Sequence, residues 1–182
     1  MKNYFIIHGS FGTSQEHWLP WLEEKLKKDT DTQVFNLDFP IGIGRQSFEH
    51  WEYVLDSIKK YINENSIFVC RSISCIFLVK YCIKNNIKIG KVVFISGFNN
   101  MLGLNEDYDS VNCTMYTNRC EEFKYLCNER ICFYSKNDPY VPLKKLEEFI
   151  NLIDAKAVLR ENAGHFNTDS GYSTFEDLLE WL

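Results

Sequence analysis

Three residues whose side chains can cooperate in nucleophilic chemistry, Ser72, Asp138 and His165, occur in this order along the chain. A serine hydroxyl is a weak nucleophile at its free pKa, so a neighbouring imidazole has to accept its proton. A carboxylate then has to hold the imidazole in the tautomer that leaves one nitrogen free. We therefore predict Ser72 as a nucleophile, His165 as a general base and Asp138 as the acid that orients the base.

Each of these residues, taken singly, also has a purely structural interpretation. Ser72 could be an ordinary helix N-cap. Asp138 lies between Asn137 and Pro139, a strong turn signal, and His165 could be a solvated loop histidine. The functional hypothesis rests on all three residues following predicted strands, because functional sites of open parallel sheets lie at the carboxyl ends of the strands.

Short apolar runs that alternate with helical segments predict those strands. Most of the runs are apolar throughout, as expected for parallel strands covered on both faces. The six predicted strands are Tyr4–Ile7, Gln33–Leu37, Ile67–Cys70, Val92–Ile95, Arg130–Tyr134 and Ala157–Leu159.

Helix signals fall between the strands. Thr13 and Glu16 have the spacing of a capping box at the start of a first helix, and Ser47 suits the N-cap of a second helix that extends to Ile62. Further helices are expected over about 73–83, from Pro142 onward, and over about 174–182. The polar stretch from about 97 to 128 is predicted to be an excursion over one end of the sheet, with one short helix.

This alternation predicts an α/β protein: a three-layer α/β/α sandwich around a six-stranded, mostly parallel sheet, with residues 1–182 as one domain. The order serine, acid, histidine is typical of the α/β-hydrolase fold. In that fold a sharp strand-to-helix turn raises the serine and aims the next backbone N–H, here that of Ile73, at the developing oxyanion. A second N–H is expected from the loop after the first strand, at Ser10, where Gly9 and Gly12 permit a tight turn.

Composition excludes several other classes. The formal net charge of −5 does not favour a nucleic-acid partner. No apolar stretch is long enough to span a bilayer, and the first apolar run is too short for a secretory signal, so we expect a cytoplasmic protein without a membrane partner. The seven cysteines include no C-x-x-C pair, which favours reduced thiols over a zinc site. We expect no metal and no cofactor.

The motifs resemble those of the small serine hydrolases of the α/β-hydrolase fold that include a retinoblastoma-binding protein and many bacterial predicted esterases. The resemblance covers nearly the whole chain, and its most specific segment is Ser135-Lys136-Asn137-Asp138-Pro139-Tyr140-Val141-Pro142. It extends to the opening His8-Gly9-Ser10-Phe11-Gly12, to His17-Trp18-Leu19-Pro20-Trp21-Leu22, to Phe39-Pro40 and Trp51, and to Gly164-His165-Phe166-Asn167 with Gly171. The resemblance implies a cofactor-free hydrolase of small esters or amides without a large lid domain.

One departure from the family concerns the turn around the serine. The family's segment usually has the sequence Gly-His-Ser-Leu-Gly, whereas this chain has Cys70-Arg71-Ser72-Ile73-Ser74. Cys and Ser are small enough for the turn to form with some strain. Arg71 brings a permanent cation beside the nucleophile, which could favour an anionic substrate or could pair with an acid.

The substrate pocket is expected to include Phe11, Phe39, Ile41, Arg71 and Phe98, because these residues follow predicted strand ends. Of the remaining histidines, His17 is expected to brace the loop around Ser10, and His50 to be a surface residue.

Two hypotheses of different class remain open. The first is a serine hydrolase that cleaves a small acyl ester or amide through an acyl-enzyme intermediate. The second is a catalytically weak or inactive hydrolase-fold protein that binds a ligand or a protein; a protein partner is possible but not indicated, since Tyr125-Leu126-Cys127-Asn128-Glu129 fails the L-x-C-x-E pattern at its first residue. A nucleotide-binding domain fits less well, because Gly42-Ile43-Gly44 follows the second strand and lacks a third glycine.

Overall fold

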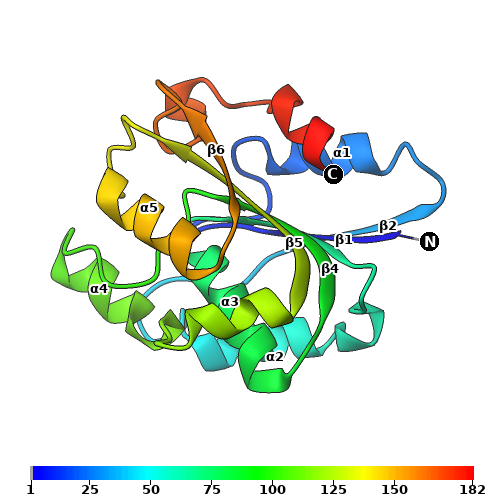
Figure 1. Cartoon of the computed structure of the whole chain (residues 1–182), viewed down its shortest axis with the longest axis horizontal. Helices are drawn as coiled ribbons and strands as arrows, with labels where there is room; N and C mark the ends of the chain where they lie inside the picture. The colour runs from blue at the N-terminus through cyan, green and yellow to red at the C-terminus, as the bar shows by residue number, and fades with distance from the viewer. Residues whose placement is uncertain (1) are drawn as a thin grey trace.

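A computed structural model of the chain, which describes residues 2–182, contains one six-stranded sheet in the order β2-β1-β3-β4-β5-β6, with every neighbouring pair parallel (Figure 1). The predicted α/β/α architecture is confirmed. Each predicted strand is present and is one to four residues longer than expected. The strands are β1 (Lys2–Ile7), β2 (Thr32–Leu37), β3 (Ile67–Arg71), β4 (Ile89–Ile95), β5 (Cys127–Ser135) and β6 (Lys156–Arg160).

Helices cover both faces of the sheet (Figure 1). One face carries α2 (Phe48–Asp56), α3 (Ile73–Asn85) and α5 (Leu143–Leu152), and the other carries α1 (Leu19–Leu26) and the C-terminal 3-10 helix η5 (Glu176–Trp181). The remaining elements are α4 (Glu106–Asn112) and the 3-10 helices η1 (Lys59–Tyr61), η2 (Cys113–Met115), η3 (Cys120–Tyr125) and η4 (Thr168–Ser170).

The two-residue period of the strands divides the core into two halves. Phe5 and Phe68 face α2 and α3, whereas Ile6 and Val69, their neighbours in sequence, face α1 and η5. Because both faces are covered, the central strands are apolar at successive positions, as the sequence predicts.

Several helix boundaries differ from the prediction. Thr13–Glu16 is no capping box: Thr13 Oγ1 accepts from the nearby Gln15 N at 3.3 Å, and α1 begins only at Leu19. His17 has a φ of 56°, a left-handed conformation that a helix cannot continue through. The Ser47 N-cap is confirmed by its bond from His50 N, but α2 ends at Asp56 rather than Ile62.

The predicted excursion runs from β4 to β5 and contains α4, η2 and η3. Asn105 caps α4 by accepting a hydrogen bond from Tyr108 N at 2.8 Å. The segment places α4 beyond the carboxyl ends of the strands, so it contributes to the site described next (Figure 1).

Candidate active site

Ser72 occupies a sharp turn between β3, which ends at Arg71, and α3, which begins at Ile73. Its φ of 61° and ψ of −124° are unusual for a residue with a side chain, and such strain costs about 1–3 kcal/mol. Ser72 N donates to Ile95 O at 2.8 Å, which fastens the turn to the end of β4. The contacts around the turn hold this strained serine at the head of the helix, where the residue lines a cavity.

Two small residues allow this turn to form without the usual glycines. Ser74 Oγ accepts from Arg71 N at 2.8 Å and lies 3.0 Å from Ile7 O, so its hydroxyl ties the turn to β1. On the other side, a Cβ placed on Gly9 would lie 3.2 Å from Ser72 Cβ. Gly9 is therefore the residue that lets the loop after β1 approach the serine closely.

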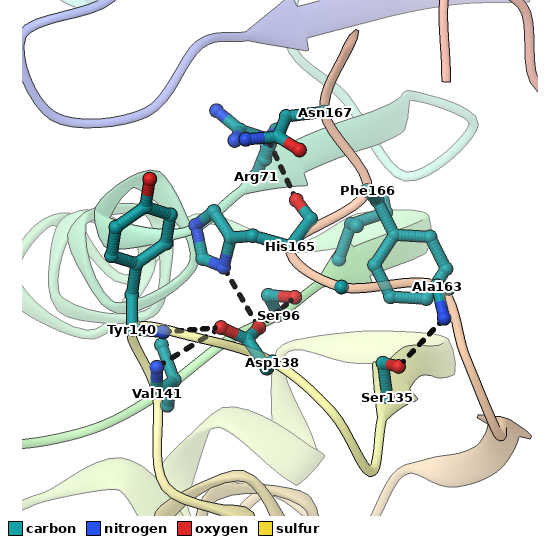
Figure 2. Close-up of polar contacts among 12 residues, drawn as sticks. Arg71, Ser96, Ser135, Asp138, Tyr140, Val141, Ala163, His165, Phe166 and Asn167 are labelled. Carbon is teal, nitrogen blue, oxygen red and sulfur yellow. Dashed lines mark hydrogen bonds and ion pairs between the residues drawn. The ribbon is translucent and has the colours of Figure 1, made fainter. Parts of the chain in front are cut away.

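Asp138 and His165 form a buried pair at the ends of β5 and β6 (Figure 2). Asp138 Oδ2 lies 2.8 Å from His165 Nδ1 and accepts from Ser96 Oγ at 2.9 Å, while Oδ1 accepts from the amides of Tyr140 and Val141 at 3.0 Å each. Burial raises the pKa of Asp138, but the hydrogen bond and charge of His165 and the two amides outweigh it, so the pKa is lowered. The Asp138 carboxylate is therefore ionised, and its two oxygens have four hydrogen-bond partners.

His165 is held in the orientation that a general base requires. An ionised carboxylate can only accept, so Nδ1 is the protonated nitrogen and Nε2 is left with its lone pair. Burial lowers the pKa of His165 below the usual histidine value, and the positive charge of Arg71 adds to this, while Asp138 opposes it. The imidazole is therefore neutral at physiological pH.

Ser72 and His165 line the same cavity, which has a volume of about 870 Å³. Among residues 2–182, no hydrogen bond joins the two side chains. The Ser72 hydroxyl instead lies near the phenol of Tyr108. Burial raises the pKa of Tyr108, and the contact with Ser72 lowers it by a smaller amount. The structure thus brings the three predicted residues to one place but forms only the Asp138–His165 contact.

The loop after β1 carries the first predicted amide of the oxyanion site, that of Ser10. His8 braces the loop: its Nε2 accepts from Phe39 N at 2.9 Å, so its Nδ1 is the donor to Gly9 O at 2.7 Å. Ser10 Oγ accepts from Gln46 Nε2 at 2.6 Å and from Asn112 Nδ2 at 3.0 Å. Sequence reasoning missed Gln46 and Asn112, since neither belongs to a recognisable motif.

Ile73 carries the second predicted amide and is the first residue of α3, so its N–H has no acceptor within the helix. Within residues 2–182 neither the Ser10 amide nor the Ile73 amide donates a hydrogen bond, so both can donate to a ligand oxygen.

The structure places the predicted pocket residues in two different environments. Phe11 and Arg71 line the cavity, whereas Phe39, Ile41 and Phe98 lie outside its lining. Phe39 and Phe98 are core residues: Phe39 packs against Trp51 at a ring distance of 4.8 Å, and Phe98 is fully buried. The apolar side chains were more stable in the core than in an open pocket.

Other residues take their place. Tyr108 and Leu104 from the excursion, Tyr140 beside Asp138, and Asn167 after His165 line the cavity.

His17 was expected to brace the Ser10 loop and instead fastens the loop that carries His165. Its Nδ1 accepts from Thr168 N at 3.2 Å and lies 3.0 Å from Thr168 Oγ1. His50 is exposed, as predicted.

The two thiols that flank Ser72 in the sequence, those of Cys70 and Cys75, are buried. All seven cysteines are free, and burial raises the pKa of Cys70 and of Cys75, the two thiols that flank the turn, well above the usual value. Residues 2–182 include no cluster of His, Cys, Asp or Glu side chains placed to hold a metal ion. None of the helices described here is long and apolar enough to cross a bilayer.

Comparison with known proteins matches a family model described as "Serine hydrolase" to residues 4–182. The chain belongs to the serine hydrolase family. The Bacillus subtilis protein named "Putative hydrolase YdeN" is 24% identical over all of this chain and 94% of its own length.

The crystal structure of the B. subtilis ydeN gene product superposes with a TM-score of 0.87 at 25% identity, covering 99% of this chain and 96% of that one. Two more distant structures share the fold. One is a protein from Pectobacterium atrosepticum described as a "putative yden-like hydrolase" (TM-score 0.69, 15% identity, 99% of this chain and 88% of that one), and the other is Est1E from Butyrivibrio proteoclasticus with bound ferulic acid (TM-score 0.70, 16% identity, 100% and 89%). This serine hydrolase therefore has the α/β-hydrolase fold.

Proposed function

We propose that the protein hydrolyses a small acyl ester or amide, with Ser72 as nucleophile, His165 as general base and acid, and Asp138 as the residue that orients His165. The observation that carries this proposal is the 2.8 Å contact from Asp138 to His165, whose imidazole lines the same cavity that receives Ser72 from a strained turn. Family membership supports the hydrolase class.

The proposed reaction begins with rotation of the Ser72 hydroxyl from Tyr108 toward His165. As Ser72 Oγ attacks the substrate carbonyl carbon, its proton passes to His165 Nε2, and the carbonyl oxygen becomes an oxyanion that accepts from the amides of Ser10 and Ile73. Asp138 stabilises the imidazolium that forms. The imidazolium then protonates the leaving alcohol or amine, which departs and leaves an acyl group on Ser72.

Water completes the cycle by the same groups. His165 takes a proton from the water molecule as the water oxygen attacks the acyl carbon, and the second oxyanion binds to the same two amides. His165 then returns the proton to Ser72 Oγ, which releases the carboxylic acid. A cavity of about 870 Å³ lined by Phe11, Tyr108 and Tyr140 has the size and aromatic character that suit a small acyl group.

A fluorophosphonate probe tests the nucleophile directly, because its phosphorus reacts only with an activated serine and loses fluoride. We expect labelling of the wild-type protein and loss of labelling in Ser72→Ala, while the exposed Ser57→Ala control is labelled normally. Labelling that persists in Ser72→Ala would contradict the assignment. Hydrolysis of p-nitrophenyl esters of increasing acyl length would then define the acyl preference.

The second candidate is a binding protein with the hydrolase fold, which the missing Ser72–His165 hydrogen bond favours. An absence of both labelling and ester hydrolysis in folded protein would support it. Labelling of Ser72 would exclude a turned-away, unreactive serine.

A further inference from the structure

The guanidinium of Arg71 is a buried charge without an acidic partner. Arg71 is only 7% exposed. Among residues 2–182 its side chain makes one hydrogen bond, which Nε donates to His165 O at 3.4 Å (Figure 2). No carboxylate of the described chain forms an ion pair with it. The sequence left open whether Arg71 pairs with an acid, and the structure answers that it does not.

The acidic groups nearest to Arg71 are engaged elsewhere or exposed. Both oxygens of Asp138 are saturated by His165, Ser96 and two amides. The Glu16 carboxylate lies 3.8 Å from His17 Nε2, and its side chain is 44% exposed. Burial of a cation is unfavourable unless a negative group accompanies it, so a ligand is the remaining source of that group.

The position of the guanidinium limits where the negative group can lie. A point 3.2 Å from Arg71 Nη1, the place that a Cβ on Gly9 would occupy, is also 3.2 Å from Ser72 Cβ. Arg71 therefore lies beside the loop that carries the Ser10 amide. A group bound to Arg71 is separated from the carbonyl that Ser72 attacks by only a few bonds.

Asn167 supplies a second donor on the same side of the cavity. Its Oδ1 accepts from Ser170 N at 3.1 Å and from Ser170 Oγ at 2.8 Å, so the amide NH₂ is the end left for a ligand. Asn167 and Arg71 both line the cavity, and Arg71 bonds to the backbone of the loop that carries Asn167. A planar fork with a neighbouring amide matches the two oxygens of a carboxylate.

The outer lining of the cavity is acidic, since Glu16, Asp107 and Asp169 also line it. These carboxylates disfavour a highly charged anion such as a phosphate dianion, while one carboxylate can be neutralised by Arg71.

We propose that Arg71 binds a carboxylate in the acyl part of the substrate, so that this hydrolase acts on half-esters or half-amides of short dicarboxylic acids. The proposal rests on the proposed function. Arg71 contacts the acyl group rather than the reacting carbonyl, which makes it a determinant of specificity.

Matched substrates test this directly. The p-nitrophenyl half-ester of succinic acid carries the carboxylate, and p-nitrophenyl butyrate is its neutral counterpart. We expect wild-type enzyme to prefer the half-ester in kcat/KM, and Arg71→Gln to lose about ten- to hundredfold on the half-ester with little change on butyrate. Arg71→Lys keeps the charge but lacks the planar fork of the guanidinium, so its kcat/KM on the half-ester should lie between those of the wild-type enzyme and Arg71→Gln. Arg119→Gln, at an exposed position, is the control.

The alternatives give different results. Equal losses on both esters would mean that Arg71 stabilises the oxyanion or the fold, and would overturn the proposal while Ser72 labelling keeps the hydrolase assignment. Equal kcat/KM values for the two esters in wild-type enzyme would also overturn it.

A binding measurement decides the case in which no turnover occurs. The stable mono-p-nitroanilide of succinic acid, measured by calorimetry on Ser72→Ala, should bind more tightly than p-nitrobutyranilide. Loss of this difference in Ser72→Ala with Arg71→Gln supports the carboxylate site without any catalysis. Equal affinities for the two anilides would overturn it.

Discussion

At the scale of single residues, Arg71 combines a charge with nearly complete burial. Burial lowers the pKa of its guanidinium to about 10, which means that folding makes the protonated form less favourable than it is in water. At neutral pH the group is charged in both the folded and the unfolded chain, so its burial opposes folding. A residue kept for binding a ligand, rather than for the fold, has this signature.

Replacement of Arg71 by methionine should therefore stabilise the protein. The variant removes the buried charge but keeps a side chain of similar length, so we expect the free energy of unfolding to rise by about 1–3 kcal/mol and the melting temperature by about 2–8 °C. Thermal unfolding followed by circular dichroism measures both, and Arg119→Met, at an exposed position, should leave the melting temperature unchanged. A lower melting temperature for Arg71→Met would show that the guanidinium supports the fold.

The position of a site residue can be predicted from the sequence when regular secondary structure determines it, and not when the path of a loop determines it. Asp138 and His165 were predictable because each follows a strand, and the sheet brings the strand ends together. The lining of the cavity was not, because Phe39 and Phe98 face the core according to how their loops turn after the strands. Tyr108 was missed since only the docked position of α4 brings it to the cavity.

At the scale of elements, the strand-to-helix turn and the loop after β1 form one unit. The turn forms without the glycines that are usual in the family because the small side chain of Ser74 fits there. The Ser74 hydroxyl accepts a hydrogen bond from Arg71 N and lies within hydrogen-bond distance of Ile7 O. Gly9 faces the turn so closely that a Cβ placed there would lie only 3.2 Å from Ser72 Cβ, tighter than an ordinary van der Waals contact. The strands were predictable from apolar runs, whereas the start of α1 was not, because the left-handed His17 delays it beyond the apparent capping signal.

Gly9→Ala should impair catalysis more than stability. Gly9 has no positive φ, so alanine fits its backbone, but the new Cβ would press on Ser72 Cβ and Arg71 Nη1 at 3.2 Å each. The loop has to retreat from the serine, which moves the Ser10 amide away from the oxyanion, and we expect kcat to fall about ten- to thousandfold.

The control for this variant lies in the same loop. In Gly12→Ala the nearest atom to the new Cβ is Glu16 Oε2, the far end of a flexible side chain, with Gly9 O at 3.3 Å. We expect a smaller loss of kcat for Gly12→Ala. Similar kcat values for Gly9→Ala and wild-type enzyme, measured with a p-nitrophenyl ester, would show that the loop position is not critical.

At the scale of the whole molecule, the site places neutral histidines inside the fold. Burial lowers the pKa of His8 and of His165 below the usual histidine value of 6.5, and both imidazoles are fixed by hydrogen bonds at Nδ1. A proton on His8 Nε2 would break the hydrogen bond from Phe39 N, and a proton on His165 Nε2 would create a cation in a buried site beside the charge of Arg71. The site thus links the protonation of two side chains to the stability of the complete fold.

This linkage predicts a loss of stability in mild acid. Well above pH 6.5 both histidines are neutral in the folded and the unfolded chain, so they contribute no pH dependence there. As the pH falls below that value, the unfolded chain binds protons that the folded chain does not, and the free energy of unfolding decreases until the lower folded pKa values are reached. Asp138, whose folded pKa is also lowered, adds a further loss at more acidic pH, where the unfolded carboxyl becomes protonated first.

Urea unfolding at a series of pH values between about 7.5 and 5 measures this slope. In His165→Asn one of the three histidines whose pKa is lowered by folding is gone, while the side-chain amide, placed as Nδ1 is, can still donate toward Asp138. We therefore expect a shallower decrease of the unfolding free energy with falling pH than in the wild-type protein. An unchanged slope would mean that His165 takes up its proton in the folded state as easily as in the unfolded chain, and that it is not held neutral by its surroundings.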